Sequence, residues 1–165
     1  MKLQIQKLTK QAFATFGDVI ETEGSKKISI NQGNIVRYHD LANVVVDYDN
    51  SGRALISIFE CVSASALPHS VDIMERHPLG SQAFIPLSVN PFVIVVAKAT
   101  EGDSPGELEA FISKAGQGVN YNPGTWHMPL ICFSAGESFI VVDRGGSGHN
   151  LDEVDISDRQ IIIVP

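Results

Sequence analysis

The sequence predicts a mainly β fold, a jelly roll closed into a small barrel with one or two short helices. Short apolar runs recur along the chain, each of a length typical of one strand. Glycine occurs 14 times and proline 8 times, and these residues separate the runs. No long stretch shows helical periodicity, which disfavours alternating β–α–β units. A closed barrel leaves few free strand edges and provides a mouth for a ligand.

Each expected element follows from a local pattern. Thr9 is placed to cap a short helix over residues 10–15. Asn31–Asn34 has the composition of a turn between two hairpin strands. Residues 107–113 suit a short helix or a strand equally well. The expected strands are, in order, residues 3–6, 28–30, 35–39, 54–61, 71–77, 82–87, 92–99, 130–133, 139–144 and 161–164.

Length and composition indicate one ordered domain spanning residues 1–165. The chain has 165 residues, of which 44% are hydrophobic, enough for one well-filled core. No internal repeat or low-complexity segment divides it. Its net charge is -7, and no cluster of lysine or arginine appears, so a nucleic-acid partner is not expected. A small anionic substrate would need local arginines to offset the acidic balance.

A membrane location is not expected either. The most apolar run, Phe92–Ala97, is far shorter than the roughly 20 residues that span a bilayer. The chain opens with an alternating segment rather than a signal peptide. Cys61 and Cys132 each lie in an apolar, strand-like segment, which suggests buried free thiols in a reducing compartment. We therefore expect a cytoplasmic protein.

The first group of candidate functional residues lies on the strand over residues 71–77. Alternation places Glu75 and His77 on the same face as apolar Val71 and Ile73, which suggests that they point into the barrel. Arg76 points the other way. A carboxylate and an imidazole inside a barrel need a polar partner, a metal or a ligand. The alternative is a solvated Glu75 at a strand end, with His77 capping the turn.

Two more groups follow strand ends. Trp126 and His127 come directly after the Pro123–Gly124 turn, and His127 is either functional or simply a packed histidine. Asp143 and Arg144 end an apolar strand before two glycines, and alternation sends them to opposite faces. Either one of them lines the barrel mouth, or both belong to an exposed strand terminus.

The predicted hairpin carries Arg37 and His39 on one face of its second strand. Such an arm packs on a partner subunit or on the barrel rim, or else its charges are simply solvated. Other catalytic signatures are absent from the sequence: it has no glycine-rich phosphate loop, no Cys-x-x-Cys zinc pattern and no serine in a nucleophile elbow. Covalent catalysis is therefore not favoured.

The chain resembles the ureidoglycolate lyase family over nearly its whole length. The longest matching block is Glu75-Arg76-His77-Pro78-Leu79-Gly80-Ser81-Gln82-Ala83-Phe84-Ile85-Pro86. The others, also in order, are residues 2–4, 16–21, 37–41, 116–121, 126–127 and 143–146. Several specific blocks in sequence make this resemblance stronger than any single motif.

The resemblance implies a cupin barrel, a homodimer, a role in allantoin and purine breakdown, and a divalent metal, namely nickel. The cupin ligand positions fall on Glu75, His77, Gln82 and His127 in this chain. Gln82 departs from the pattern, because an amide is a weaker ligand than a carboxylate. Met128 stands where family members often have a second histidine, and methionine is a poor ligand for a hard cation.

The implied reaction eliminates urea from (S)-ureidoglycolate and leaves glyoxylate. It needs a base for the hydroxyl proton, an acid for the departing nitrogen and a group that holds the carboxylate. We assign His127 as base or metal ligand, Glu75 as its acid–base partner and Asp143 as a further catalytic candidate. The substrate-binding candidates are Arg144, Arg76 and Arg37 for the carboxylate, and Gln82, Tyr121 and Trp126 for the rest of the molecule.

Two other functions remain open from the sequence. One is a metal-dependent cupin oxygenase or isomerase acting on another small carboxylic acid, against which Gln82 counts. The other is a non-catalytic cupin that binds a small acid in regulation, although no DNA-reading domain accompanies it.

Overall fold

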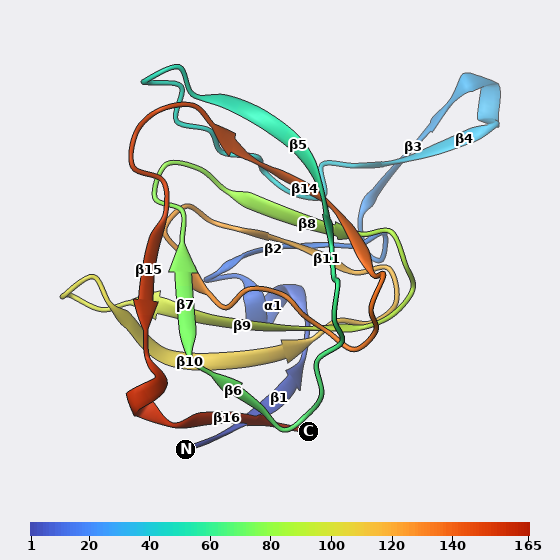
Figure 1. Cartoon of the computed structure of the whole chain (residues 1–165). Helices are drawn as coiled ribbons and strands as arrows, with labels where there is room; N and C mark the ends of the chain where they lie inside the picture. Colours follow the sequence, from blue (N-terminus) through green and yellow to red (C-terminus); the bar gives the residue numbers. More distant parts are fainter.

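The computed structural model describes all residues 1–165, and most of its regular structure is strand (Figure 1). One short helix is present, α1 (Lys10–Phe13), together with the 3-10 turns η1 (Asn31–Gly33) and η2 (Ser157–Arg159). Thr9 caps α1 by accepting a hydrogen bond from the Ala12 amide at 3.1 Å, as expected. No helix has the length and apolar composition needed to span a membrane.

Two sheets face each other and form the barrel. The five-stranded sheet has the order β2 (Gly17–Ile20), β11 (Gly118–Tyr121), β8 (Gln82–Pro86), β14 (Ser138–Gly145) and β5 (Arg53–Glu60). The nine-stranded sheet has the order β15 (Asp152–Asp155), β7 (Ile73–Arg76), β12 (Trp126–His127), β9 (Phe92–Ala99), β10 (Pro105–Ile112), β1 (Lys2–Lys7), β16 (Ile161–Val164) and β6 (His69–Val71), and β13 (Ile131–Cys132) also pairs with β9. A separate hairpin, β3 (Lys26–Ile30) and β4 (Ile35–His39), projects away from the barrel (Figure 1).

The nine-stranded sheet curls, and this gives the molecule two apolar cores. Phe92, Ile94 and Val96 of β9 pack in the core between the two sheets. Val93 and Val95 of the same strand pack in a second core, made only by elements of the curled sheet and its connections. Strand β9 is therefore buried on both faces, which explains its uninterrupted apolar sequence. The predicted mainly β, barrel-like class is confirmed.

Most predicted elements are present, with one clear error. Residues 92–99 and 161–164 are strands with the expected bounds, and residues 107–113 lie mostly in strand β10. The prediction of one strand over residues 71–77 is wrong. The chain breaks at Asp72 into β6, an edge strand of the curled sheet, and β7, which lies next to the strand at the other edge. The short strands β2, β11 and β15 were not predicted, because four residues of mixed polarity give no clear apolar alternation.

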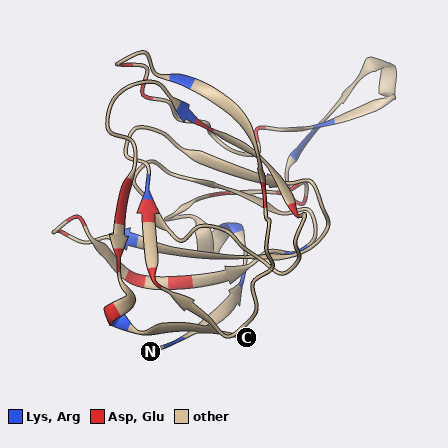
Figure 2. Ribbon diagram, viewed as in Figure 1, with Lys and Arg blue, Asp and Glu red and all other residues tan.

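Charged residues are distributed unevenly over the barrel. Figure 2 shows that acidic residues gather on β10 and β15, whereas lysine and arginine are scattered singly.

Candidate active site

Three side chains that the sequence analysis singled out converge on the inner face of the curled sheet. Strands β7 and β12 pair so that His127 lies directly opposite Glu75. His127 Nε2 lies 3.3 Å from Glu75 Oε1, and His77 Nε2 lies 3.9 Å from the same oxygen. One potential ligand atom from each residue falls within 4.8 Å of the other two. We refer to Glu75, His77 and His127 as the triad.

Backbone carbonyls set the orientation of both imidazole rings. His77 Nδ1 lies 2.8 Å from the carbonyl oxygen of Asn150, and His127 Nδ1 lies 3.0 Å from that of Thr125. A carbonyl can only accept a hydrogen bond, so each Nδ1 carries a proton, and in the neutral ring Nε2 presents a lone pair. Both Nε2 atoms are buried and have no hydrogen-bond partner. A proton or a cation between these atoms would give both Nε2 atoms a partner.

Glu75 is ionised at neutral pH. Its contact with His127 lowers the pKa of the carboxyl below the ordinary value of 4.5, against the opposing effect of burial. The charges of His127 and His77 lower the Glu75 pKa further when those rings are protonated. The carboxylate can therefore accept a proton or bind a cation, and only 21% of its side chain is exposed to competing water.

The donor set fits a divalent metal ion. Two imidazole lone pairs and one carboxylate are a common ligand set for divalent transition metals. Metal-binding histidines almost always donate the other ring N–H to a carbonyl or carboxylate, as His77 and His127 do. The two buried, unpaired Nε2 atoms would be satisfied by such an ion. The triad is therefore a candidate metal centre as well as a candidate acid–base group.

Tyr121 and Gln82 lie beside the triad. The Tyr121 ring stacks on His127, with centroids 4.3 Å apart and an interplanar angle of 13°. Gln82 pairs directly with Tyr121 across β8 and β11, so the two side chains are neighbours on the inner face. Gln82 is 5% exposed, and its Oε1 has no hydrogen-bond partner. Burial and the charge of Glu75 raise the pKa of Tyr121, so its phenol stays protonated.

Asp143 also belongs to the inner face. Its neighbour Val142 pairs with Ala83, and the alternation along β14 turns Asp143 toward the face that carries Gln82. Asp143 Oδ1 is buried and unpaired. The inner face thus holds two unpaired acceptor oxygens in addition to the triad.

Glu75 is one of nine residues that line a cavity of about 170 Å³. Its walls are mostly apolar, and sequence patterns did not identify them: Phe59, Glu60, Cys61, Phe84, Pro129, Leu130, Cys132 and Phe139. Burial, and then the neighbouring Cys61 thiol, raises the pKa of Cys132 to about 12. That thiol stays protonated and acts as part of the apolar lining. The alternating apolar residues of β5 and β14 were the sequence pattern from which part of this lining could have been predicted.

The expectation that Val71 and Ile73 share an apolar inner face with Glu75 is wrong. Val71 lies in β6 and packs with Met74 in the second core. Ile73 is 46% exposed. Glu75 still lines the cavity, because its pairing with His127 fixes the face to which it points.

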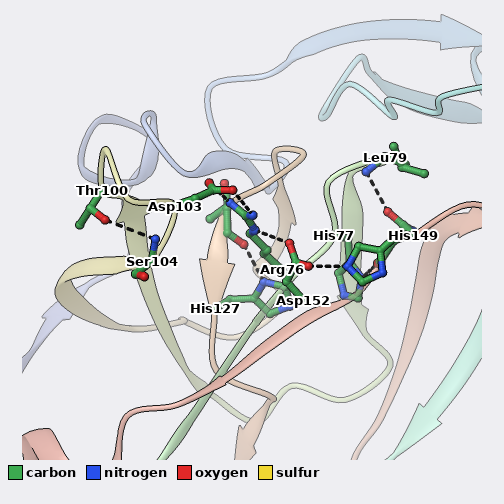
Figure 3. A network of polar contacts seen from close by, with 11 residues as sticks. Arg76, His77, Leu79, Thr100, Asp103, Ser104, His127, His149 and Asp152 are labelled. Atoms are coloured by element: carbon green, nitrogen blue, oxygen red, sulfur yellow. Dashed lines mark hydrogen bonds and ion pairs between the residues drawn. The ribbon is translucent and has the colours of Figure 1, made fainter.

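The structure does not bring Arg76 or Trp126 to the triad. Arg76 points to the opposite face of β7, where Nε donates to Asp152 Oδ2 at 2.7 Å and both terminal nitrogens donate to Asp103 (Figure 3). Its guanidinium lies over the Trp126 ring, 4.8 Å from the centroid. Trp126 itself packs in the second core. The Asp103 and Asp152 contacts raise the pKa of Arg76, which stays charged.

Arg144 holds a loop in place. It is 5% exposed, and its guanidinium donates to the carbonyls of Asp47, Asp49 and Ser147 at 2.7–3.1 Å. A Cβ on Gly80 would lie 2.7 Å from the Arg144 Cβ, so glycine allows this close approach. Arg37 lies on the exposed surface of the β3–β4 hairpin. Of the predicted carboxylate-binding arginines, none contacts Glu75 or His127 in the structure.

Comparisons with known proteins agree on one family. A family model described as ureidoglycolate lyase matches residues 1–163. A protein from Burkholderia mallei (strain NCTC 10229) named ureidoglycolate lyase is 49% identical over 156 residues, covering 94% of this chain and 90% of that one. A protein of the same name from Pseudomonas putida (strain GB-1) is 49% identical over 162 residues, covering 98% of this chain and 96% of that one.

A solved structure also resembles this one at a greater distance. It is a dTDP sugar isomerase from Desulfovibrio desulfuricans G20, with a TM-score of 0.42 and 13% identity, covering 84% of this chain and 83% of that one.

Proposed function

The chain belongs to the ureidoglycolate lyase family, and from that premise we propose that it eliminates urea from (S)-ureidoglycolate to give glyoxylate. The observation that carries this proposal is the pair formed by Glu75 and His127. The ionised carboxylate of Glu75, which lines a small cavity, lies 3.3 Å from the imidazole Nε2 of His127. The pathway that such a reaction serves is the breakdown of allantoin and purines.

The chemistry of the substrate explains why such a pair is needed. Ureidoglycolate is a hemiaminal, in which one carbon bears a hydroxyl, a carboxylate and a urea nitrogen. As the hydroxyl proton leaves, the carbonyl of glyoxylate forms, and the bond from carbon to the urea nitrogen breaks. The departing nitrogen then takes up a proton. A well-placed acid–base group accelerates each proton transfer by on the order of 100- to 10,000-fold.

The residues of the inner face can divide this work. Glu75, ionised because of His127, accepts the hydroxyl proton and returns it to the urea nitrogen. Tyr121 keeps the His127 ring in place by stacking on it. The unpaired oxygens of Gln82 and Asp143 can accept hydrogen bonds, whereas the urea N–H groups donate them. The apolar walls around Phe59 and Phe139 exclude water from the reacting carbon.

We further propose that the triad holds a divalent metal, and the family resemblance supports nickel. Glu75, His77 and His127 would be its ligands, with Gln82 as the fourth candidate. When bound, such an ion would polarise the hydroxyl and neutralise the carboxylate of the substrate. A metal in this role would replace the arginine that was expected to bind the substrate carboxylate, since none of the predicted arginines contacts the triad.

Product analysis tests the reaction. Racemic ureidoglycolate should give equimolar urea and glyoxylate, with half of the substrate consumed and no ammonia formed. Release of ammonia in place of urea would indicate an amidohydrolase. Consumption of oxygen would indicate an oxygenase, which two histidines and one carboxylate also allow. Either result would overturn the proposed elimination.

Metal removal tests the cofactor. Thorough chelation should lower turnover, and nickel should restore it more fully than magnesium, because imidazole ligands favour the softer ion. Glu75→Gln should weaken nickel binding measured by calorimetry, whereas His69→Ala, in β6 at the far end of the sheet, should not. Turnover that survives complete chelation would leave the chemistry to the side chains alone.

We also propose a homodimer. The β3–β4 hairpin projects from the barrel and exposes Ile30, Ile35 and Val36 by 42%, 49% and 50% (Figure 1). A stable interface buries upwards of roughly 1,200 Å² in total, and an arm with exposed apolar side chains can contribute to it. Light scattering should give twice the chain mass at micromolar concentration. A monomer mass would contradict this proposal.

The location and domain organisation are proposals of the same kind. The structure contains two free thiols, Cys61 and Cys132, which suits the reducing cytoplasm. We propose that residues 1–165 act as a single catalytic domain in that compartment. Fractionation of cells that make the protein would test the location.

A further inference from the structure

The segment that leads into β15 lies against the turn that follows His77. A single residue of this segment, Asn150, makes two hydrogen bonds to that turn. Its backbone carbonyl accepts from His77 Nδ1 at 2.8 Å, and its side-chain Oδ1 accepts from the Leu79 amide, also at 2.8 Å. The contact to Leu79 fixes where the Asn150 carbonyl lies, and that carbonyl in turn accepts from the ring of His77.

Regular pairing cannot supply these contacts. Strands β7 and β15 are antiparallel, and their register ends where Asp152 lies opposite Arg76. His77 and Asn150 both lie beyond this last pair. The hydrogen bonds of Asn150 therefore connect the turn after β7 with the segment before β15, beyond the point where the β7–β15 backbone pairing ends.

The polar contacts of Arg76, on the face of β7 opposite Glu75, anchor the segment that leads into β15. Asp152 accepts from Arg76 Nε at 2.7 Å and also contacts His149 Nε2. Arg76 is itself held by Asp103 and by the Trp126 ring. Asn150 lies between His149 and Asp152 in the chain, so the residues on both sides of it belong to this network.

The position of Asn150 has a chemical consequence at the triad. A neutral imidazole has one proton, and in free histidine it resides mainly on Nε2. The Asn150 carbonyl requires the proton on Nδ1, which leaves the Nε2 lone pair directed toward Glu75, 3.9 Å away. With the proton on Nε2, His77 could neither bind a cation nor accept a proton at that atom.

We propose that Asn150 is a positioning residue that holds His77 in the Nδ1–H tautomer, and that Arg76 and Asp152 keep Asn150 in place. The effect on catalysis rests on the proposed lyase function, whereas the effect on the tautomer does not. Arg76 thereby serves the site from the opposite face of its strand, without contact with the substrate.

Nitrogen-15 NMR of the imidazole rings measures the tautomers directly. The metal-free protein should be used at a pH at which the rings are neutral, because a metal at Nε2 would impose the tautomer by itself. In the wild type, both His77 and His127 should show the Nδ1–H form. Asn150→Leu should move His77 toward the Nε2–H form and leave His127 unchanged, because Thr125 and not Asn150 holds that ring.

A matched control comes from the other end of β15. Asp155 Oδ1 accepts from the Ser157 amide at 2.8 Å, a bond of the same kind as that of Asn150. Asp155→Leu should leave both tautomers and turnover unchanged. Asn150→Asp keeps an acceptor oxygen for Leu79 and should keep the His77 tautomer. Should Asn150→Leu fail to fold by circular dichroism, Asn150→Ala removes the same acceptor with less bulk.

Turnover provides the second measurement. Loss of a residue that orients a metal or acid–base ligand costs about 10- to 100-fold, so kcat of the Asn150 variant should fall by at least about tenfold. An unchanged His77 tautomer would overturn the proposal, as would an equal change in both histidines or a changed tautomer with normal kcat. A wild type with the expected tautomers and no urea release would instead contradict the proposed function.

Discussion

Strands β7 and β14 each carry two adjacent charged residues that point to opposite faces, and the two faces differ in how their polar atoms are paired. On the outer face, Arg76 and Arg144 are fully engaged by carboxylates and carbonyls. On the inner face, Asp143 has a buried oxygen without a partner, and Glu75 faces two imidazole nitrogens that lack one. The same sequence pattern therefore produces a structural face and a functional face.

The difference matters because unpaired buried groups are costly. Leaving a buried donor or acceptor unsatisfied costs about 1–3 kcal/mol, and proteins retain such groups where a ligand pairs with them. The outer face gains stability from its ion pairs and hydrogen bonds. The unpaired groups of the inner face destabilise the free protein, and a bound substrate or metal would stabilise it by pairing with them. Substitutions on the two faces should therefore affect different quantities.

The largest expected effect is on turnover, from substitution of the inner face. Glu75→Gln keeps the shape of the side chain and removes its charge, so kcat should fall by at least about 100-fold while the melting temperature changes little. His127→Gln should have a similar effect, and the double variant should be scarcely worse, because the two residues act as a unit. A continuous glyoxylate assay measures all three.

His69→Ala is the control for these variants, because His69 lies in β6 at the far end of the sheet. It should have normal turnover. Near-normal turnover of His127→Gln would place the chemistry elsewhere. Unfolding of that variant would mean that His127 is a packed histidine of the core.

On the outer face, the largest effect should be on stability. Arg144→Met removes the guanidinium that pairs with the carbonyls of Asp47, Asp49 and Ser147. The free energy of unfolding should fall by about 3 kcal/mol, since three loop carbonyls lose the donor that holds them to the barrel. Urea titration measures this change.

The turnover of Arg144→Met in the folded fraction decides its role. Turnover should stay close to that of the wild type, if Arg144 only holds the loop. A large rise in KM with unchanged stability would instead support the prediction that Arg144 binds the substrate carboxylate.

A smaller effect should appear as a dependence of stability on pH. His127 lowers the pKa of Glu75 in the folded protein below its ordinary value of 4.5. The unfolded state therefore binds a proton more tightly than the folded state does. The resulting stability is fully present above the unfolded pKa and is lost as the pH falls through the folded pKa.

Comparison with Glu75→Gln isolates this contribution. The difference in unfolding free energy between wild type and variant should shrink on acidification below pH 4.5, the ordinary value for the carboxyl. A difference that stays constant over this range would mean that the contact with His127 does not favour the ionised carboxylate.

Much of the fold could be predicted from the sequence, because apolar alternation and turn residues mark most strands. Strand β9 had a clear signal, since burial on both faces requires an unbroken apolar run. Strand β15 had none: Asp152–Asp155 is mostly acidic and becomes a strand only because the edge of β7 is free to pair with it. Such pairing depends on residues far apart in the chain.

The triad could be predicted and its surroundings could not. Glu75, His77 and His127 stand next to turns, and their types suggest a site without knowledge of the fold. The partners of Arg76 and Arg144 lie on distant loops, so sequence alone could not show that these guanidinium groups are already paired. The assignment of an arginine to the substrate carboxylate stays a prediction. Asn150 carried no signal, because its action depends on a backbone carbonyl.

A crystal structure with glyoxylate, the expected product, would show directly whether Glu75 and His127 form the active site. We predict that the product lies at the inner end of the cavity, with one of its oxygens within about 3.2 Å of His127 Nε2 or of a metal held by the triad. The outer-face pairs of Arg76 and Arg144 should remain as they are. Product bound away from Glu75 and His127, or held by an arginine released from its present partners, would contradict the assignment of these two residues as the active site.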